Sequence, residues 1–170
     1  MRASRRFLKA TLLCLAVSAF SVLAAAQSEE ALAEQILGPQ WQQLSQRAGM
    51  IFGGTVLTAA PQTSRTDRAP STVELSFRVD RAIAGVQAGQ ILTIHEWAGA
   101  SSRHRPMRPG DHLLLFLYPP SRLGLTSPVG GALGQIALDA SGQRFRQNVR
   151  QPVPIPLSRL ERAIRAARGE

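Results

Sequence analysis

The hydrophobic pattern is most regular between Thr72 and Arg81. Apolar and polar side chains alternate along this segment, the apolar set being Val73, Leu75, Phe77 and Val79 and the polar set being Glu74, Ser76, Arg78 and Asp80. Successive side chains of an extended chain point to opposite faces, so a period of two places the first set in a core and the second in water. The pattern predicts a half-buried β-strand whose acidic and basic side chains form a solvated face.

A strand of a second kind is predicted where apolar residues follow one another without alternation. Pro109-Gly110 is a turn signal, six apolar residues run from Leu113 to Tyr118, and Pro119-Pro120 ends the run. A short apolar run bounded by turn residues is typical of a strand buried on both faces. The sequence therefore predicts a central strand here, with the other strands arranged around it.

Further strands complete a mainly β domain. Glycines inside a strand often mark a bulge or a bend, so Gly53-Gly54 indicates a coiled first strand of the kind that small barrels require. Ala140-Ser141-Gly142 is typical of a hairpin turn. The predicted strands are Met50–Thr58, Ile91–Trp97, Gln135–Asp139 and Gln143–Val149, which with the two above suit a small barrel of five or six strands.

Helices are predicted on both sides of this β domain. Near the start, apolar residues recur at helical spacing, Gly38-Pro39 ends the helix, and Gln40–Gln46 forms a second helical piece in which Trp41 covers the core. Near the end, Ser158 and Glu161 match a capping box, and a stripe of apolar residues predicts docking on the barrel. The stripe consists of Leu157, Leu160 and Ile164, and the opposite face carries Arg159, Arg162, Arg165 and Arg168.

The first 26 residues have the pattern of a cleavable signal peptide. Basic residues precede an apolar stretch from Ala10 to Leu23, and Ala24-Ala25-Ala26 offers small residues for cleavage before Gln27. The alternative of a membrane anchor needs about 20 apolar residues, and this run is shorter. The predicted order is a signal peptide at 1–26, a helical lead at 27–48, a β-barrel at 49–150, and a proline-rich spacer with a helix at 151–170. We expect an exported protein, in the periplasm or outside the cell, without a transmembrane segment after cleavage.

Composition narrows the chemistry. The chain has 20 Lys and Arg against 11 Asp and Glu, and four of the basic residues but no acidic ones lie within 1–26. The remaining excess of five positive charges is moderate, and no basic run interleaved with aromatics is present, so a nucleic-acid partner is not expected. The single cysteine, Cys14, lies in the signal segment. Thiol catalysis, cysteine-ligated zinc and disulfides are therefore excluded from the mature chain.

No catalytic, cofactor-binding or metal-ligating residue is predicted. The three histidines, His95, His104 and His112, fall on a strand, a loop and a strand. His95-Glu96 begins like a zinc-protease helix, but the second histidine at the required spacing is absent and the surroundings are strand-like. Asp111 is adjacent to His112 and points to the opposite face of a strand, so the two cannot act as a base and its orienting group. Ser127 lacks the turn of a hydrolase nucleophile.

Two loops are the predicted contact surface. The polar loop from Ala98 to Met107 and the glycine-rich loop from Gly124 to Gly134 stand out, because ordered loops on a rigid scaffold are where binding modules make contact. In the second loop region we expect the apolar side chains of Leu123, Leu125, Val129 and Leu133 to be buried. The predicted partner-contact residues are Arg103, His104, Arg105, Leu125, Thr126 and Ser127.

The order of these motifs resembles bacterial secreted domains with the tissue-inhibitor-of-metalloproteinase-like (netrin-like) OB fold. The resemblance covers about Met50 to Tyr118 and rests on short motifs. These are Phe52-Gly53 with Val56, then Leu75, Phe77 and Val79, then Arg81 to Gly85 with Gly89, then Ile91 and Ile94, and last Arg108-Pro109-Gly110-Asp111 followed by Leu114, Phe116 and Leu117. It implies an OB-like β-barrel. Animal inhibitors of this family chelate the protease zinc through an N-terminal cysteine, which the mature chain lacks.

The function expected from these patterns is that of an exported, non-catalytic binding module. The resemblance implies an extracellular metalloprotease as a partner to engage or inhibit, and another envelope protein is the wider possibility. The loop around Leu123 to Gly131 also resembles exported proteins associated with matrixin-type metalloproteases. One alternative is a structural protein of the envelope that uses its arginine-rich faces at anionic surfaces. The other is a hydrolase or metalloenzyme, for which the residues show no motif.

Overall fold

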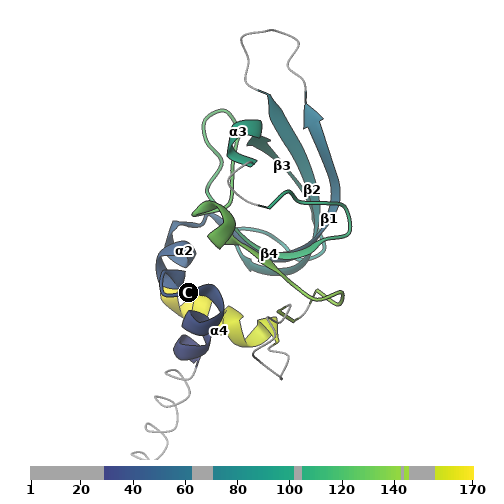
Figure 1. The fold of residues 1–170 in the computed structure, drawn as a ribbon. Coiled ribbons are helices and arrows are strands. Elements are labelled where there is room, and N and C mark those ends of the chain that lie inside the picture. Colours follow the sequence, from purple (N-terminus) through teal and green to yellow (C-terminus); the bar gives the residue numbers. More distant parts are fainter. Residues whose placement is uncertain (1–28, 63–70, 102–104, 143, 146–155) are drawn as a thin grey trace, which may run out of the picture.

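The computed structural model describes residues 29–62, 71–101, 105–142, 144–145 and 156–170 (Figure 1). The protein is mostly β, with one five-stranded antiparallel sheet in the order β3-β2-β1-β4-β5. The strands are β1 (Met50–Gln62), β2 (Thr72–Ala84), β3 (Ile91–Trp97), β4 (His112–Leu117) and β5 (Gln135–Ala137). The helices are a helical segment at 29–37, α2 (Trp41–Arg47), α3 (Ala98–Ser101) and α4 (Leu157–Arg168), and η1 (Gly131–Gly134) is a 3₁₀ turn.

The long β1–β2 hairpin forms the middle of the sheet. Both strands extend beyond their predicted ends at Thr58 and Arg81, because antiparallel pairing continues to Gln62 opposite Thr72 at one end and to Ile51 opposite Ala84 at the other. A pattern of side chains along one strand carries no information about such pairing. The predicted irregularity of the first strand is confirmed, since the register shifts at three places, one of them between Gly53 and Gly54.

Close packing explains why two glycines stand in the centre of β1. A Cβ atom on Gly53 would lie 2.8 Å from Cδ2 of Leu157, at the start of α4. A Cβ atom on Gly54 would lie 2.7 Å from the carbonyl oxygen of Arg78 on β2. The glycines therefore let α4 and the backbone of β2 approach β1 closely.

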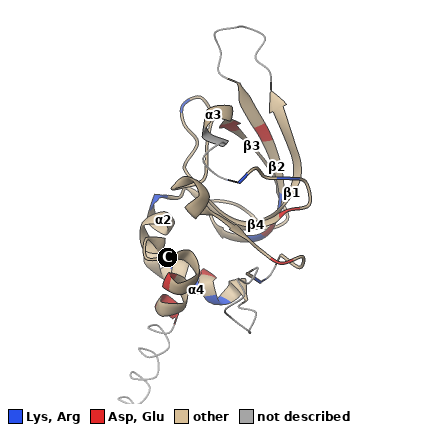
Figure 2. Ribbon diagram, in the orientation of Figure 1, with Lys and Arg blue, Asp and Glu red and all other residues tan. Residues whose placement is uncertain are grey.

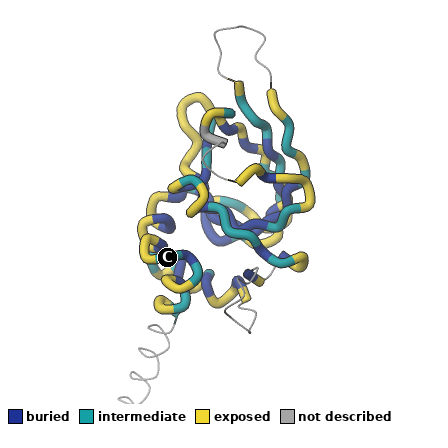
Figure 3. Tube along the Cα trace, viewed as in Figure 1, coloured by how far each residue is buried: buried dark blue, intermediate teal, exposed yellow. Residues whose placement is uncertain are grey.

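The sheet is buried on both faces over part of its length, as predicted for the central strand. Leu113, Leu115 and Leu117 of β4 point to one face of the sheet, the concave one, where they pack with Phe52 and Phe77. The two phenylalanine rings meet edge to face with their centroids 5.6 Å apart. The intervening Leu114 and Phe116 point the other way, toward the helices. The dark interior of the curl in Figure 3 corresponds to the concave core.

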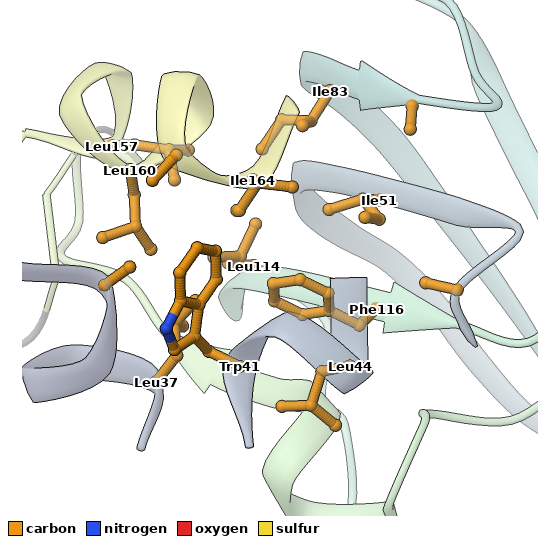
Figure 4. Packing of buried hydrophobic residues seen from close by; sticks show 14 of the residues in the cluster. Leu37, Trp41, Leu44, Ile51, Ile83, Leu114, Phe116, Leu157, Leu160 and Ile164 are labelled. Carbon is orange, nitrogen blue, oxygen red and sulfur yellow. The ribbon is translucent and has the colours of Figure 1, made fainter. Parts of the chain in front are cut away.

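The helices cover the convex side of the sheet at one end. Trp41 and Leu44 of α2 and Leu160 and Ile164 of α4 pack on Phe116 and its neighbours (Figure 4). Trp41 is buried, which confirms its predicted place as a cover of the core. The predicted docking of the apolar stripe of α4 is likewise confirmed, since its residues are almost completely buried.

The start of α4 differs from the predicted capping box. The helix begins at Leu157 with Pro156 as its N-cap, and no side chain caps its free N–H groups. Ser158 is therefore inside the helix, and the prediction of Ser158 as N-cap is wrong. Glu161 instead accepts a hydrogen bond from Arg81 Nε of β2 at 2.5 Å and another from Arg165. The Glu161 carboxylate therefore forms an ion pair with a distant residue, Arg81, and does not cap the helix as the local motif predicted.

Most of the arginines of α4 make internal contacts. Arg168 Nη1 donates to the carbonyl oxygens of Ser45 and Ala48, each at 2.7 Å, and so satisfies groups at the end of α2. Arg165 donates to the carbonyl oxygen of Ala82. Arg162 pairs with Glu29 of the helical segment 29–37, and the hydrogen bond and charge of that carboxylate raise the pKa of Arg162.

Regular strand pairing does not close the sheet into the predicted barrel of five or six strands. Two isolated bridges instead join the segment 125–128 to the sheet, His95 of β3 with Leu125 in parallel and Leu117 of β4 with Pro128 in antiparallel orientation. The predicted sixth strand, Gln143–Val149, lies largely outside the described residues, and of it only Phe145 bridges to Leu138 and Arg144 to Pro156. Within the described part of the chain, no helix combines the length and apolar character needed to cross a membrane.

Candidate functional site

The two predicted contact loops begin to converge at the end of β3. Leu125 of the second loop bridges His95 of β3 in parallel, and the N–H of Thr126 donates to the His95 carbonyl oxygen at 2.9 Å. The first loop starts at Ala98, as α3, directly after β3. The hydrogen bond from Thr126 to His95 therefore holds the second loop close to Ala98, where the first loop begins.

The other side of the second loop is fixed to β4. The N–H of Tyr118 donates to the Ser127 carbonyl oxygen at 3.0 Å, and the N–H of Val129 donates to the Phe116 carbonyl oxygen at 2.7 Å. The Thr126 hydroxyl donates to the Tyr118 carbonyl oxygen at 2.6 Å. These bonds hold the loop as an ordered segment between β3 and β4.

The predicted contact residues differ in what they offer to a partner. Arg103 and His104 lie outside the described residues, and Arg105 is exposed. Leu125 and Ser127 are half-buried. Thr126 is buried and its hydroxyl donates to the Tyr118 carbonyl oxygen, so this residue stabilises the conformation of the loop and does not offer its side chain to a partner.

The loop also exposes apolar side chains for which the sequence predicted burial. Leu123 is 81% exposed and Leu133 is 51% exposed, so the predicted burial of both is wrong, whereas Val129 is buried as expected. A tight turn accounts for Leu123, because the Gly124 N–H donates to the Ser121 carbonyl oxygen at 2.9 Å and Gly124 has a φ of +72°. The turn projects Leu123 from the body of the molecule. We call Arg105, Leu123, Leu125 and Ser127 the loop surface.

A second constellation, a cluster of polar side chains, lies across three strands on the convex side of the sheet. The Thr55 hydroxyl of β1 is 2.6 Å from Asp80 Oδ2 of β2 and 3.0 Å from His112 Nδ1 of β4. Arg78 of β2 donates to Asp80 Oδ1 at 2.8 Å and to Thr55 Oγ1 at 3.3 Å. Sequence reasoning missed this cluster because it assigned Arg78 and Asp80 to a solvated face. The only sequence signal is a threonine within the buried stretch of β1.

Proton counting assigns the roles in the cluster. An ionised Asp80 can only accept, so the single Thr55 proton goes to Asp80. The Thr55 oxygen then accepts from Arg78 and from His112, which must carry its proton on Nδ1. Every hydrogen-bonding position of the buried hydroxyl is thereby used. The hydrogen bonds of the cluster join β1, β2 and β4, so its observed contribution is to connect these strands.

The remaining titratable groups do not assemble into a metal centre. Among residues 29–62, 71–101, 105–142, 144–145 and 156–170, no group of three or more histidine, cysteine, aspartate or glutamate side chains could hold a metal ion. Asp111 Oδ2 accepts the Arg108 N–H at 2.9 Å and so belongs to the Pro109-Gly110 turn. Glu96 is completely buried on the concave side of β3. Figure 2 shows acidic and basic residues scattered over the elements in this view.

Comparisons with known proteins do not assign the chain to a family. No protein-family model matches the chain, and neither a curated protein nor a solved structure is significantly similar to it.

Proposed function

We propose that the protein is an exported, non-catalytic binding module that engages another exported protein through the loop surface. The proposal of export rests on the signal-peptide pattern of residues 1–26, from which we expect the mature protein in the periplasm or outside the cell. The resemblance to inhibitor-like secreted domains makes an extracellular metalloprotease the first partner to test. Because the inhibitory cysteine of the animal proteins is missing, such binding would use the loops and not zinc chelation.

We also propose that the fold is an OB-like barrel. The segment 125–128 touches β3 through Leu125 and β4 through Pro128. If this segment is counted as a short strand, the order becomes β1-β2-β3-segment-β4 and returns to β1, which pairs with β4. Two single bridges support this closure. The curl of the hairpin at its three register shifts supplies the bend that closure needs.

The hydrogen bond from Thr126 to His95 is the observation that carries the functional proposal. It fixes an ordered loop on a rigid strand, and the loop exposes Leu123 to solvent. An isolated exposed leucine is common on any surface. On a loop anchored at both ends it is a pre-organised contact, and binding to it loses little conformational entropy.

The alternative is an envelope protein that uses the arginine-rich face of α4. The internal contacts of these arginines make this alternative less well supported. Arg162, Arg165 and Arg168 each bond to other parts of the protein. Of the four arginines of that face, Arg159 is the one whose side chain makes no hydrogen bond or ion pair with a described residue, and it is exposed. A lipid or polymer surface would have to compete with contacts that hold the helical layer together.

Capture of a partner tests the proposal. Mature protein immobilised on beads is mixed with the exported fraction of its source, and bound proteins are identified. The same preparation is assayed for inhibition of purified extracellular metalloproteases. We expect one dominant partner, and an affinity at least about tenfold lower for Leu123→Asp, as is typical of a charge placed at a contact.

Ile91→Asp is the matched control, because Ile91 is also an exposed apolar residue, 70% accessible, but lies on β3 outside both predicted contact loops. It is expected to bind like the wild type. The proposal fails if no protein is retained and no protease is slowed, or if the two variants lose affinity equally. Binding to anionic vesicles that disappears at high salt would favour the envelope alternative instead.

A further inference from the structure

The convex side of the sheet carries a second surface, on the part that the helices leave open. Strand register places the side chains of directly paired residues on the same face, so Thr72 lies beside Trp97, Glu74 beside His95, and Ser76 beside Thr93. On the next strand, Gln62 is opposite Thr72 and Thr58 is opposite Ser76. We call this group the outer face, and its members are Thr58, Gln62, Thr72, Glu74, Ser76, Thr93, His95 and Trp97.

Trp97 is the aromatic member of the outer face. This residue is 49% exposed, in contrast to the buried Trp41. Gly99 lies against the six-membered ring, since a Cβ atom there would be 2.9 Å from Trp97 Cζ2. The indole is therefore supported by the backbone on one side and open to solvent on another. An indole held in this way offers a flat apolar surface to a ligand. Because the backbone already restricts the ring, binding a ligand there loses little side-chain entropy.

Hydrogen-bonding groups surround this platform. Glu74 and His95 are direct cross-strand neighbours, with Cβ atoms about 5 Å apart as in any such pair. Within the described part of the chain, no hydrogen bond or ion pair is observed for either side chain. Ser76 and Thr93 form a hydroxyl pair at 2.9 Å on the exposed face. The outer face thus combines an aromatic ring with donors and acceptors that are turned to solvent.

The charge of this face favours a neutral ligand. At its border the Arg78 guanidinium is paired with Asp80, at 2.8 Å. The Glu74 carboxylate then stands in the middle of the face, where it would repel a phosphate or sulfate polymer. It would accept hydrogen bonds from neutral hydroxyl groups, which are stronger when the acceptor is ionised. A single-stranded nucleic acid, which also stacks on aromatic rings, is disfavoured by the same carboxylate.

We propose that the outer face binds a neutral glycan chain of β-linked glucose-type sugars. Such rings carry all their hydroxyls at the edge and present flat C–H faces. One flat face can therefore lie on the Trp97 indole while the hydroxyl edge meets Glu74 and His95. The central strands of OB-like barrels include known platforms for oligosaccharides, so the location suits the proposed fold. The outer face shares no residue with the loop surface, which it adjoins where Leu125 bridges His95, and the glycan proposal does not depend on a protein partner.

Titration with two soluble probes, cellohexaose and the hexamer of N-acetylglucosamine, tests the proposal by calorimetry and by tryptophan fluorescence. We expect at least one probe to bind, to shift Trp97 emission to shorter wavelength and to protect it from acrylamide quenching. Trp97→Ala should weaken binding at least about tenfold. Glu74→Gln keeps the shape but weakens the acceptor, so a loss of severalfold is expected.

Tyr118→Ala is the control for loss of an exposed aromatic ring, because Tyr118 lies beyond β4 and outside the outer face. It should bind both probes like the wild type. Far-UV circular dichroism and the melting temperature establish that each variant is folded. The proposal is overturned if neither probe binds the wild type, if Trp97→Ala binds as well as the wild type, or if Trp97→Ala loses a captured protein partner while glycan binding stays unchanged.

Discussion

The hydroxyl of Thr55 donates to the carboxylate of Asp80, with 2.6 Å between Oγ1 and Oδ2. This bond crosses from β1 to β2, and the contact of the same oxygen with His112 crosses from β1 to β4. A single buried hydroxyl therefore joins the three central strands. The bond lies where the register of β1 shifts on either side, so it fixes a pairing that the backbone alone leaves irregular.

Replacement of Thr55 by valine should destabilise the protein. The substitution keeps the branched shape and removes the only group that satisfies Asp80 Oδ2 and His112 Nδ1 together. Leaving such partners without a hydrogen bond costs about 1–3 kcal/mol in the free energy of unfolding. Urea denaturation measures the change. Ser76→Ala, which removes an exposed hydroxyl pair, should cost less than about 0.5 kcal/mol, and equal effects of the two variants would contradict the assigned role.

The same cluster predicts the tautomer of His112. Because Thr55 gives its proton to Asp80, neutral His112 should carry its proton on Nδ1. Long-range ¹H–¹⁵N correlation spectra distinguish the two tautomers. The exposed His95 serves as the internal reference, and Thr55→Val should remove the preference of His112. A wild-type His112 protonated on Nε2 would mean that Thr55 donates to the imidazole and that the proton count is wrong.

The two central glycines of β1 should respond differently to alanine. At Gly54 the new methyl group would meet a backbone oxygen 2.7 Å away, and a strand cannot move aside without losing pairing. At Gly53 it would meet the end of the Leu157 side chain, which can rotate. We expect Gly54→Ala to lower the free energy of unfolding by about 3 kcal/mol and Gly53→Ala by about 1 kcal/mol. A double variant with Leu157→Ala tests the second contact, since the two losses should not add.

Arg168 should contribute to stability, unlike Arg159 at the other end of the same helix. Arg168 donates to two carbonyl oxygens at the end of α2, whereas Arg159 is exposed. Loss of such charged hydrogen bonds is worth about 1–3 kcal/mol, so Arg168→Ala should melt at a lower temperature. Arg159→Ala should be within about 0.5 kcal/mol of the wild type. If both variants melt alike, the arginine contacts between α4 and α2 do not stabilise the fold.

Local sequence pattern determined the strands and the places where they bend. The alternation at Leu75 and Phe77 indicates a strand buried on one face, and the unbroken run through Phe116 indicates a strand buried on both faces. Burial could be predicted because it determines the order of apolar residues along a strand. The bend at Gly53-Gly54 was also readable, because only glycine tolerates such close approach of a neighbour. Trp41 and the stripe of α4 followed from helical spacing in the same way.

Only the tertiary structure decided how distant residues meet. Thr55, Asp80 and His112 come together because antiparallel register brings three strands side by side, and no local pattern reports register. Glu161 left its predicted capping role because Arg81 approaches it across the fold. Leu123 is exposed because bonds to Ser121 turn the loop outward. The sequence by itself thus determined which side chains are buried in the core. The pairing of strands that are distant in the sequence decided which polar groups and loops became neighbours.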